Sequence, residues 1–483
     1  MDKKRIKTYI DKVYNNQFLG NNEYQNLFTI KDYHLMYNEL LSLLSTHGYL
    51  PIEDLRDILY DRSKIEEKLN TFIKEMGMAP GAVISYGTSN YNEIITVGNS
   101  KEVSLVNNRT IITPKEMQCD TIFDLASVSK MFITLSVVKL VENGLIGIND
   151  EITKYCPEFT NLKGVTIFDL ITFRVPLITS GKIENASDKG EALDLLHDIK
   201  INEKYVKSVY TDMGAMVLKY VVEKATGMPY YHFVQTYILN KANMLETSYR
   251  PVDINRVAST NYRTQLLGDG SVKVDVYEDG QVNDPKAQKM ESTSGDLCGH
   301  AGMFSTASDM TNLALSIIDG SLLSRDDIDN ITRNQTGSIY YENDIKKTHQ
   351  YFGYLCYLKN PILKESEVYH ALSGKSFAYA GYTGTQFTVD PVNGVYLFLG
   401  SNRVHDRVAF IDPSIHPLAY TTCTNRKMVA VPGEGLKVDS RSFAYDKDYY
   451  IVRPLLKLSM QYKMLDDLLI DKDLEPVKRV RKL

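Results

Sequence analysis

The sequence predicts a mixed α/β protein in which early and late β-strands flank a largely helical middle. Hairpin patterns lie at residues 78–97 and 377–401, and helical stretches alternate with loops across residues 151–297. Composition fits a globular chain, because 483 residues that are 43% hydrophobic and 24% charged can bury a large core. It excludes disordered, collagen-like and mucin-like proteins.

Residues 1–69 are expected to form a helical extension that packs on the main domain or on a partner. Their apolar residues recur at helical spacing, with a break at Gly48–Pro51. The spacing gives two apolar faces, made of Tyr37, Leu40, Leu41 and Leu44, and of Ile65, Leu69 and Ile73. This segment holds no cluster of nucleophile, base or metal ligand.

Residues 70–470 are expected to form the main domain, with a helical subdomain at about 151–297. Early β-rich runs at 82–86 and 94–97 are followed by a helix from Ser127 to Asn143. Later elements complete the pattern: a helix at Met213–Thr226 ended by Gly227, a hairpin of Phe377–Asp390 and Val395–Ser401, and a helix at Val452–Leu469.

Charge and cysteine content limit the partners and the compartment. The 55 Lys and Arg residues nearly balance 60 Asp and Glu residues, so we expect no nucleic-acid partner. The basic run 478–482 lies in residues 471–483, which we interpret as a solvated tail. The five cysteines are widely spaced and contain no CxxC pair, which fits a reducing compartment. The sequence also has no apolar stretch behind the first charges and no apolar run long enough to span a membrane. We therefore expect a soluble, cytoplasmic protein with no membrane partner.

The strongest local signal for chemistry is Ser127-Val-Ser-Lys130 at the start of a helix. Positions i and i+3 share a helix face, so Lys130 can approach the Ser127 hydroxyl. A partly desolvated lysine can accept the serine proton if burial lowers its pKa, and the helix N-terminus favours a developing oxyanion. Ser136 also has a lysine three residues on, Lys139, but lies inside the same helix.

The tripeptide Tyr210-Thr211-Asp212 precedes the helix at Met213–Thr226. A tyrosine near the serine can relay a proton to the leaving group, and the Asp212 carboxylate can hold Lys130 through a charge-assisted hydrogen bond. The alternative for Asp212 is a helix N-cap.

Five segments together carry a resemblance: FDLASVSK from Phe123, GLIGINDEITKYCPEF from Gly144, YTDMGAMVLKYVVEKATG from Tyr210, GHAGMFSTASDM from Gly299 and YAGYTGTQFTVDP from Tyr379. In order and spacing, over about 70–405, they resemble the serine β-lactamase and penicillin-binding-protein-like superfamily, specifically class C β-lactamase-related serine hydrolases. The resemblance implies an antiparallel sheet flanked by helices, with an inserted, mostly helical subdomain and a site where the two meet.

The resemblance also implies roles for individual residues. Ser127 would be the acylated nucleophile, Lys130 its base and Tyr210 the proton relay, with Asp212 where the family often has Asn. The family's third motif falls on Tyr379, Ala380 and Gly381. The resemblance implies that substrate binds to this motif and to Asp212, Tyr382 and Arg403. The backbone N–H groups of Ser127 and Tyr382 would form the oxyanion hole, and neither a cofactor nor a metal is implied.

Two departures from the family pattern affect substrate recognition. Tyr379 replaces the basic residue of the third motif, so a substrate carboxylate would need Lys375 or Arg403. Phe173-Arg-Val-Pro176 replaces a His-Thr-Ser-Gly segment. His300 is interpreted as structural, because a lysine and tyrosine pair needs no histidine base.

The sequence therefore predicts a serine hydrolase that cleaves a small ester or amide through an acyl-enzyme. A D-amino-acid peptide or a cell-wall fragment is one candidate substrate. Two alternatives stay open: an acyltransferase using the same acyl-enzyme, and a receptor that binds a ligand without hydrolysing it. The absence of GxSxG, HExxH, Walker A and GxGxxG patterns disfavours other common enzyme classes. The oligomeric state is left open.

Overall fold

The computed structural model describes residues 62–106, 109–204, 210–342, 345–362, 367–415, 420–423, 426–469 and 477–482. The apolar face expected at Tyr37–Leu44 lies outside these residues. The face made of Ile65, Leu69 and Ile73 is described and is buried, on helix α5 (Arg62–Asn70) and the π-helical turn η1 (Thr71–Glu75).

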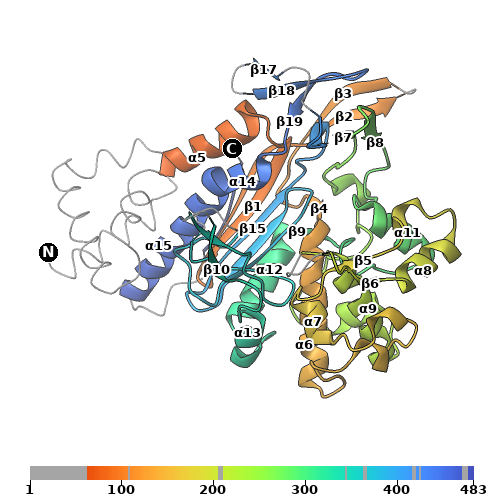
Figure 1. Cartoon of the computed structure of the whole chain (residues 1–483). Helices are drawn as coiled ribbons and strands as arrows, with labels where there is room; N and C mark the ends of the chain where they lie inside the picture. The colour runs from red at the N-terminus through yellow and green to blue at the C-terminus, as the bar shows by residue number, and fades with distance from the viewer. Residues whose placement is uncertain are drawn as a thin grey trace.

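An eight-stranded sheet forms the centre of the fold (Figure 1). The predicted hairpins are present, with Ala82 opposite Val97 in the early one and Asp390 opposite Val395 in the late one. Strands β1 and β15 then pair antiparallel and join the two parts of the chain. Across the sheet the order is β12 (Tyr357–Leu358), β13 (Phe377–Ala380), β14 (Gln386–Asp390), β15 (Val395–Ser401), β1 (Gly81–Thr88), β2 (Tyr91–Val106) and β20 (Val477–Lys482), and β3 (Arg109–Glu116) also pairs with β2.

Alternating side chains along the central strands separate two apolar layers. In β15, Leu397 and Leu399 belong to one layer, whereas Tyr396 and Phe398 belong to the other. Figure 1 shows α15 and α5 on one face of the sheet and α12 on the other. The covering elements are α12 (Ala307–Ile318), α14 (Phe443–Lys447), η8 (Asp448–Val452) and α15 (Arg453–Leu469). The sheet flanked by helices confirms the expected fold class.

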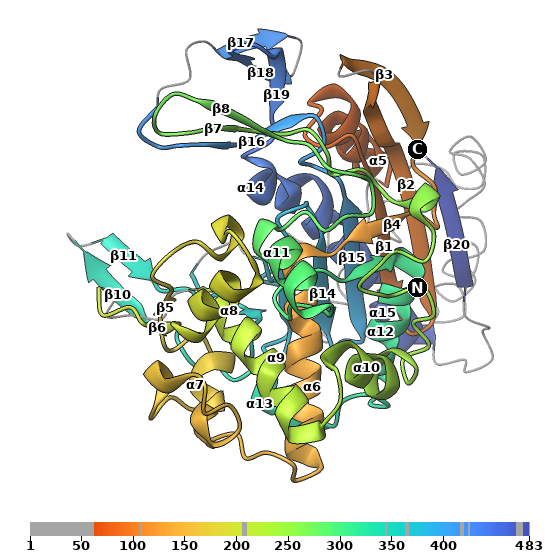
Figure 2. The same cartoon turned by 90° about the vertical axis from the view of Figure 1, so that its right-hand side faces the viewer.

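Helices occupy most of the middle of the chain and lie together beside the sheet (Figure 2). Helix α9 (Met213–Thr226) has the predicted bounds, and Gly227 ends it with a φ of 69°. The other elements are η2 (Ala126–Ser129), α6 (Lys130–Glu142), η3 (Ile152–Lys154), η4 (Thr160–Leu162), α7 (Ile167–Ile171), β5 (Leu177–Ile178), η5 (Ile183–Asn185), α8 (Lys189–His197), β6 (Lys200–Ile201), α10 (Tyr230–Val234), η6 (Gln235–Leu239), η7 (Ile254–Arg256), α11 (Pro285–Ser294), α13 (Arg325–Ile331), β10 (Ile339–Glu342) and β11 (Ile345–Thr348).

Four smaller sheets among the described residues were not anticipated, and two of them are the short pairs β5–β6 and β10–β11. Strands β4 (Ile122–Asp124) and β9 (Phe304–Thr306) form an antiparallel pair just before Ser127. A six-stranded sheet lies at one end of the molecule (Figure 2). Its order is β17 (Tyr420–Cys423), β18 (Arg426–Val431), β19 (Gly435–Asp439), β16 (Arg407–Ile411), β7 (Arg263–Leu266) and β8 (Val272–Asp275). Residues 263–275 of the expected helical subdomain therefore contribute strands to this sheet.

The basic C-terminal segment is a second difference from the sequence prediction. Residues Val477–Lys482 form β20, which pairs parallel with β2 and places Val480 opposite Ile94. Val477–Lys482 therefore extend the main sheet as a strand that the sequence analysis did not predict. Lysine and arginine on an edge strand are typical, because charge discourages pairing with another chain.

Candidate active site

Ser127 is half-buried in the turn η2, which leads directly into α6. The preceding residue, Ala126, has a φ of 46°. This left-handed conformation is costly for a residue with a side chain. It forms a sharp turn between β4 and α6, so Ser127 lies at the start of the helix, as the sequence predicts.

The loop after β13 is fixed to the chain that precedes Ser127. The Thr383 hydroxyl donates to the Asp124 carbonyl at 2.8 Å, and the Thr385 hydroxyl donates to the Leu125 carbonyl at 2.9 Å. A Cβ atom on Gly381 would lie 2.6 Å from the same Leu125 oxygen. Only glycine allows this approach, which explains the glycine of the third motif.

Lys130 is buried beneath Ser127. Its Nζ donates to Ser127 Oγ at 2.8 Å, to Asp212 Oδ1 at 2.8 Å and to the His300 carbonyl at 3.2 Å. Three acceptors match the three N–H groups of an ammonium. The lysine is therefore held in a fixed position against the serine hydroxyl.

The pKa of Lys130 moves opposite to the sequence expectation. Burial does act to lower this pKa, but the nearby Asp212 carboxylate and the Tyr210 phenol outweigh it, and the pKa lies above its ordinary value. In this structure Lys130 is therefore a charged hydrogen-bond donor to Ser127. The sequence argument made the role of Lys130 as a base conditional on burial lowering its pKa, and the Asp212 partner acts against that condition.

Asp212 occupies the N-cap position of α9 but makes no capping hydrogen bond. Its two oxygens bind different cations: Oδ1 accepts from Lys130 at 2.8 Å and Oδ2 accepts from Lys286 Nζ at 2.6 Å. Burial acts to raise its pKa, but Lys130, His300 and Lys286 hold the pKa well below its ordinary value. The geometry supports the predicted contact with Lys130 rather than the N-cap alternative.

Lys286 is a site residue that the sequence analysis missed. It lies in the first turn of α11, and its pKa is raised because Asp212 and Asp284 outweigh the effect of burial. A sequence signal did exist, since a lysine in the first turn of a helix opposes the helix dipole. No motif connects it with Asp212, which lies 74 residues earlier.

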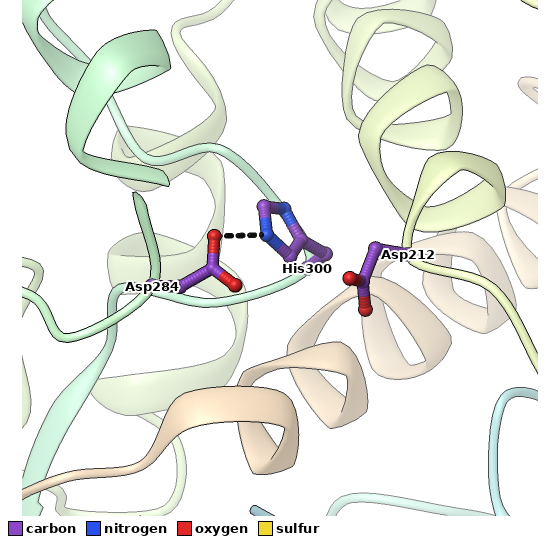
Figure 3. A group of neighbouring side chains, drawn as sticks. All are labelled: Asp212, Asp284 and His300. Atoms are coloured by element: carbon purple, nitrogen blue, oxygen red, sulfur yellow. Dashed lines mark hydrogen bonds and ion pairs between the residues drawn. The ribbon is translucent and has the colours of Figure 1, made fainter. Parts of the chain in front are cut away.

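A second ion pair adjoins this group (Figure 3). His300 Nε2 lies 2.9 Å from Asp284 Oδ1, and His300 Nδ1 lies 3.2 Å from Cys298 Sγ. Burial acts to lower the pKa of His300, but Cys298 and Asp284 raise it to about 10. Burial acts to raise the pKa of Asp284, but His300 lowers it to about 2. The pair fixes the position of His300, whose backbone carbonyl accepts a hydrogen bond from Lys130. This arrangement is compatible with the structural role expected for His300.

Asp212, Asp284 and His300 bring one potential ligand atom each to within 4.8 Å of one another. Their other contacts disfavour a metal ion at this point. Lys130 and Lys286 already bind both Asp212 oxygens, and a bound cation would face these two ammonium groups. We therefore interpret the group as a network of ion pairs.

Tyr210 lies over the reacting residues within an aromatic cluster. Its ring centroid is 4.9 Å from Lys130 Nζ, 5.0 Å from the Phe173 ring and 6.0 Å from the Tyr357 ring. Phe173 is buried and has a φ of 56°. The segment that departs from the family pattern at Phe173 thus provides an aromatic support for Tyr210.

The Tyr379 side chain faces the core, although the sequence prediction placed this residue among the groups that bind substrate. It is 2% exposed, and its hydroxyl donates to Thr134 Oγ1 at 3.1 Å and to the Tyr354 carbonyl at 3.2 Å. Tyr379 therefore packs against α6 through its contact with Thr134. Ala380, the middle residue of the motif, is half-buried and pairs with Gln386 across the sheet.

The two candidate cations for a substrate carboxylate have other partners. Arg403 is buried, donates from Nε to the Tyr382 carbonyl at 2.7 Å and lies 4.6 Å from the Tyr382 ring centroid. Lys375 forms a surface ion pair with Asp329. Arg403 therefore holds Tyr382 in place, and neither cation contacts Ser127 or Lys130 in the described residues.

The backbone N–H groups of Ser127 and Tyr382 have no acceptor within the described parts of the chain. The hydrogen bonds of Thr383 and Thr385 hold the segment that contains Tyr382 against the segment that precedes Ser127. Two such N–H groups can stabilise the oxyanion of an acyl-transfer reaction.

Residues 72–419 match the family model described as Beta-lactamase. The chain belongs to the beta-lactamase family. A relative named as a putative D-alanyl-D-alanine carboxypeptidase, from Salmonella schwarzengrund, is 26% identical over 337 residues, which cover 64% of this chain and 75% of the relative. Together with the family match, it identifies the chain as a serine hydrolase of the β-lactamase and penicillin-binding-protein type.

Solved structures show the same fold. EstCE1, described as a hydrolase with promiscuous acyltransferase activity, aligns with a TM-score of 0.54 and 15% identity over 82% of this chain and 98% of its own. The D-amino acid amidase of Ochrobactrum anthropi SV3 aligns with a TM-score of 0.51 and 17% identity over 70% of this chain and 90% of its own.

Within the described residues, no helix of this β-lactamase-family protein has the length and apolar character needed to span a bilayer. The cytoplasmic location stays a prediction from the sequence.

Proposed function

We propose that this protein cleaves a small ester or amide through an acyl-enzyme on Ser127. The observation that carries the proposal is the 2.8 Å contact between Lys130 Nζ and Ser127 Oγ, with Tyr210 beside the same ammonium. A serine hydroxyl needs such a partner, because its own proton is too tightly held for attack at neutral pH.

The reaction starts from the fraction of molecules in which the Lys130 group has lost one proton. Ser127 Oγ attacks the substrate carbonyl carbon while its proton moves to Lys130. The tetrahedral intermediate then collapses, the leaving group departs with a proton relayed by Tyr210, and Ser127 carries the acyl group. Water attacks this ester by the reverse proton path, which releases the acid and restores the serine.

The oxyanion would bind to the N–H groups of Ser127 and Tyr382. Each donor of this kind contributes roughly 3 kcal/mol to the stability of the transition state. Arg403 positions the second donor through the carbonyl of Tyr382.

A neutral acyl group fits the site better than one that carries a carboxylate. Tyr379 provides no charge, and Arg403 and Lys375 bind other groups. Among the D-amino-acid compounds to which the names of the carboxypeptidase and amidase relatives point, amides are therefore favoured over short cell-wall peptides, which carry a terminal carboxylate.

Acyl transfer is the second candidate, supported by the acyltransferase activity described for EstCE1. It differs only in the acceptor, an alcohol or amine in place of water.

Intact-mass spectrometry with a fluorophosphonate and with a penicillin tests these functions. Hydrolysis predicts a stable phosphonate on Ser127 and a penicillin adduct that disappears in water. Transfer predicts an adduct that disappears only with added nucleophile, and a receptor predicts no adduct. Ser136→Ala is the matched control for Ser127→Ala, because Ser136 also has a lysine three residues on but donates to the Phe132 carbonyl inside α6.

A further inference from the structure

The Asp212 carboxylate lies between two ammonium groups from different elements. Lys130 comes from α6 and Lys286 from α11, and each binds a separate oxygen of Asp212. The side chain of Lys130 is 1% exposed, whereas those of Asp212 and Lys286 are 21% and 23% exposed. Lys286 is therefore less buried than Lys130, and about as exposed as Asp212.

The position of Lys286 is unfavourable for the helix that carries it. Asp284 caps α11 and Pro285 begins it, so Lys286 lies in the first turn, where the helix dipole is positive. The next lysine of the same helix, Lys289, instead donates to the backbone carbonyl of Ala186. The ion pair with Asp212 offsets the unfavourable interaction of Lys286 with the helix dipole.

The charge of Lys286 bears directly on Lys130. A lone carboxylate next to Lys130 would hold its proton strongly, which opposes its use as a base. A second cation on the same carboxylate weakens that hold, because it offsets the negative charge that Lys130 experiences. The titratable and charged groups that face one another here are Lys130, Glu184, Tyr210, Asp212, Asp284, Lys286, Cys298 and His300.

We propose that Lys286 is a positioning residue that offsets part of the charge of Asp212, so that the carboxylate orients Lys130 while holding its proton less tightly than Asp212 alone would. The proposal rests on the proposed function, because its effect is measured at Ser127. Asp212 Oδ1 then faces Lys130, while Lys286 on Oδ2 offsets part of the negative charge of the carboxylate.

The experiment measures the rate at which a fluorophosphonate labels Ser127 from about pH 7 to about pH 12, because the pKa of Lys130 lies above the ordinary value of lysine, about 10.4. In this step Ser127 Oγ bonds to phosphorus, the P–F bond breaks, fluoride leaves and the serine proton passes to Lys130. Lys286→Met should move the midpoint of the pH profile upward, and a midpoint one pH unit higher slows labelling about tenfold at any pH well below it. Asp212→Asn should move it downward, and the double variant should return it close to that of the unmodified protein.

Three controls separate charge balance from a structural effect. Lys286→Arg keeps the charge and should keep the midpoint. Lys289→Met removes a lysine one turn along α11 and should also keep it. If Lys286→Met does not fold, adding this substitution to Asp212→Asn should still raise the midpoint of that variant.

A midpoint unchanged in Lys286→Met, or a double variant that does not return toward the original midpoint, would overturn the proposal. Equal labelling of Ser127→Ala would instead reject the proposed nucleophile, which is a different failure.

Discussion

The helical side of the candidate site places charged groups beside Ser127, whereas on the sheet side neutral groups lie nearest to Ser127 and the charge of Arg403 is bound to Tyr382. On the helical side Lys130, Asp212 and Lys286 form a chain of ion pairs. On the sheet side the groups are backbone amides, the threonines that fix them and a tyrosine turned into the core. The comparison teaches that charge is concentrated where a proton must move, while neutral dipoles surround the expected position of the substrate carbonyl.

The largest expected effect comes from removing the side chain of Ser127 or of Lys130 at the centre of the site. Ser127→Ala and Lys130→Ala should each lower kcat/KM for an aryl ester by about 10⁴-fold or more. The two residues act together, so removing either one removes most of the catalytic effect of the pair. Thermal unfolding of Ser127→Ala should match that of the unmodified protein. Ester hydrolysis undiminished in Ser127→Ala would reject this account of the site.

The two sides also differ in how far the sequence predicts them. Ser127 and Lys130 are three residues apart on a helix, so backbone geometry alone brings them together. Tyr210 and Asp212 lie far along the chain from Lys130, and the tripeptide before α9 suggested them before the resemblance supported their roles. Lys286 was missed, since neither a local spacing nor a motif connects it with Asp212.

Prediction on the sheet side failed for physical reasons of a different kind. The motif at Tyr379 identified the strand correctly, and Gly381 is required by its close approach to Leu125. The long Tyr379 side chain, however, ends against Thr134 on α6. The small sheet that contains β16 was also missed, because its strands are short and several pair in parallel with distant segments.

The second prediction concerns a charge placed on the neutral side. Tyr379→Lys puts an ammonium in a core position, so the free energy of unfolding in urea should fall by about 2–4 kcal/mol. Tyr379→Phe, which loses only a hydroxyl, should cost about 1 kcal/mol. If Tyr379→Lys were as stable as Tyr379→Phe and hydrolysed a cephalosporin faster than the parent, the lysine would have reached the substrate instead.

The third prediction concerns substrate charge. Because Arg403 on the sheet side is already bound to Tyr382, a β-lactam carboxylate loses a charge-assisted hydrogen bond of about 1.5–3 kcal/mol, or roughly ten- to a hundred-fold in kcat/KM. A short-chain aryl ester should therefore be a better substrate than a chromogenic cephalosporin. Faster hydrolysis of the cephalosporin than of every neutral ester tested would show that another cation, with Lys286 the first candidate, receives the carboxylate.

The fourth prediction is the pH dependence of the charged side. The pKa of Lys130 is raised above its ordinary value, so the neutral amine becomes scarcer as the pH falls. Accordingly kcat/KM should rise with pH through neutrality, by about tenfold per pH unit below the midpoint. The midpoint belongs to the coupled group of Lys130, Asp212 and Tyr210. A plateau already reached at pH 6 would contradict the charged Lys130 of this structure.

The smallest expected effect lies at the contact between Arg403 and Tyr382. Arg403 donates to the Tyr382 carbonyl and lies over the Tyr382 ring, so it orients the residue whose N–H is proposed to bind the oxyanion. Arg403→Met should lower kcat for the aryl ester about three- to tenfold, because the donor stays present but is less well oriented. KM should change little, since the oxyanion forms only in the transition state. Arg403→Lys keeps the charge but loses the planar geometry of the guanidinium, so its kcat should lie between that of the unmodified protein and that of Arg403→Met. A large rise in KM with unchanged kcat would instead mean that Arg403 binds the substrate directly, and the sheet side would then contain the charge that this structure does not place there.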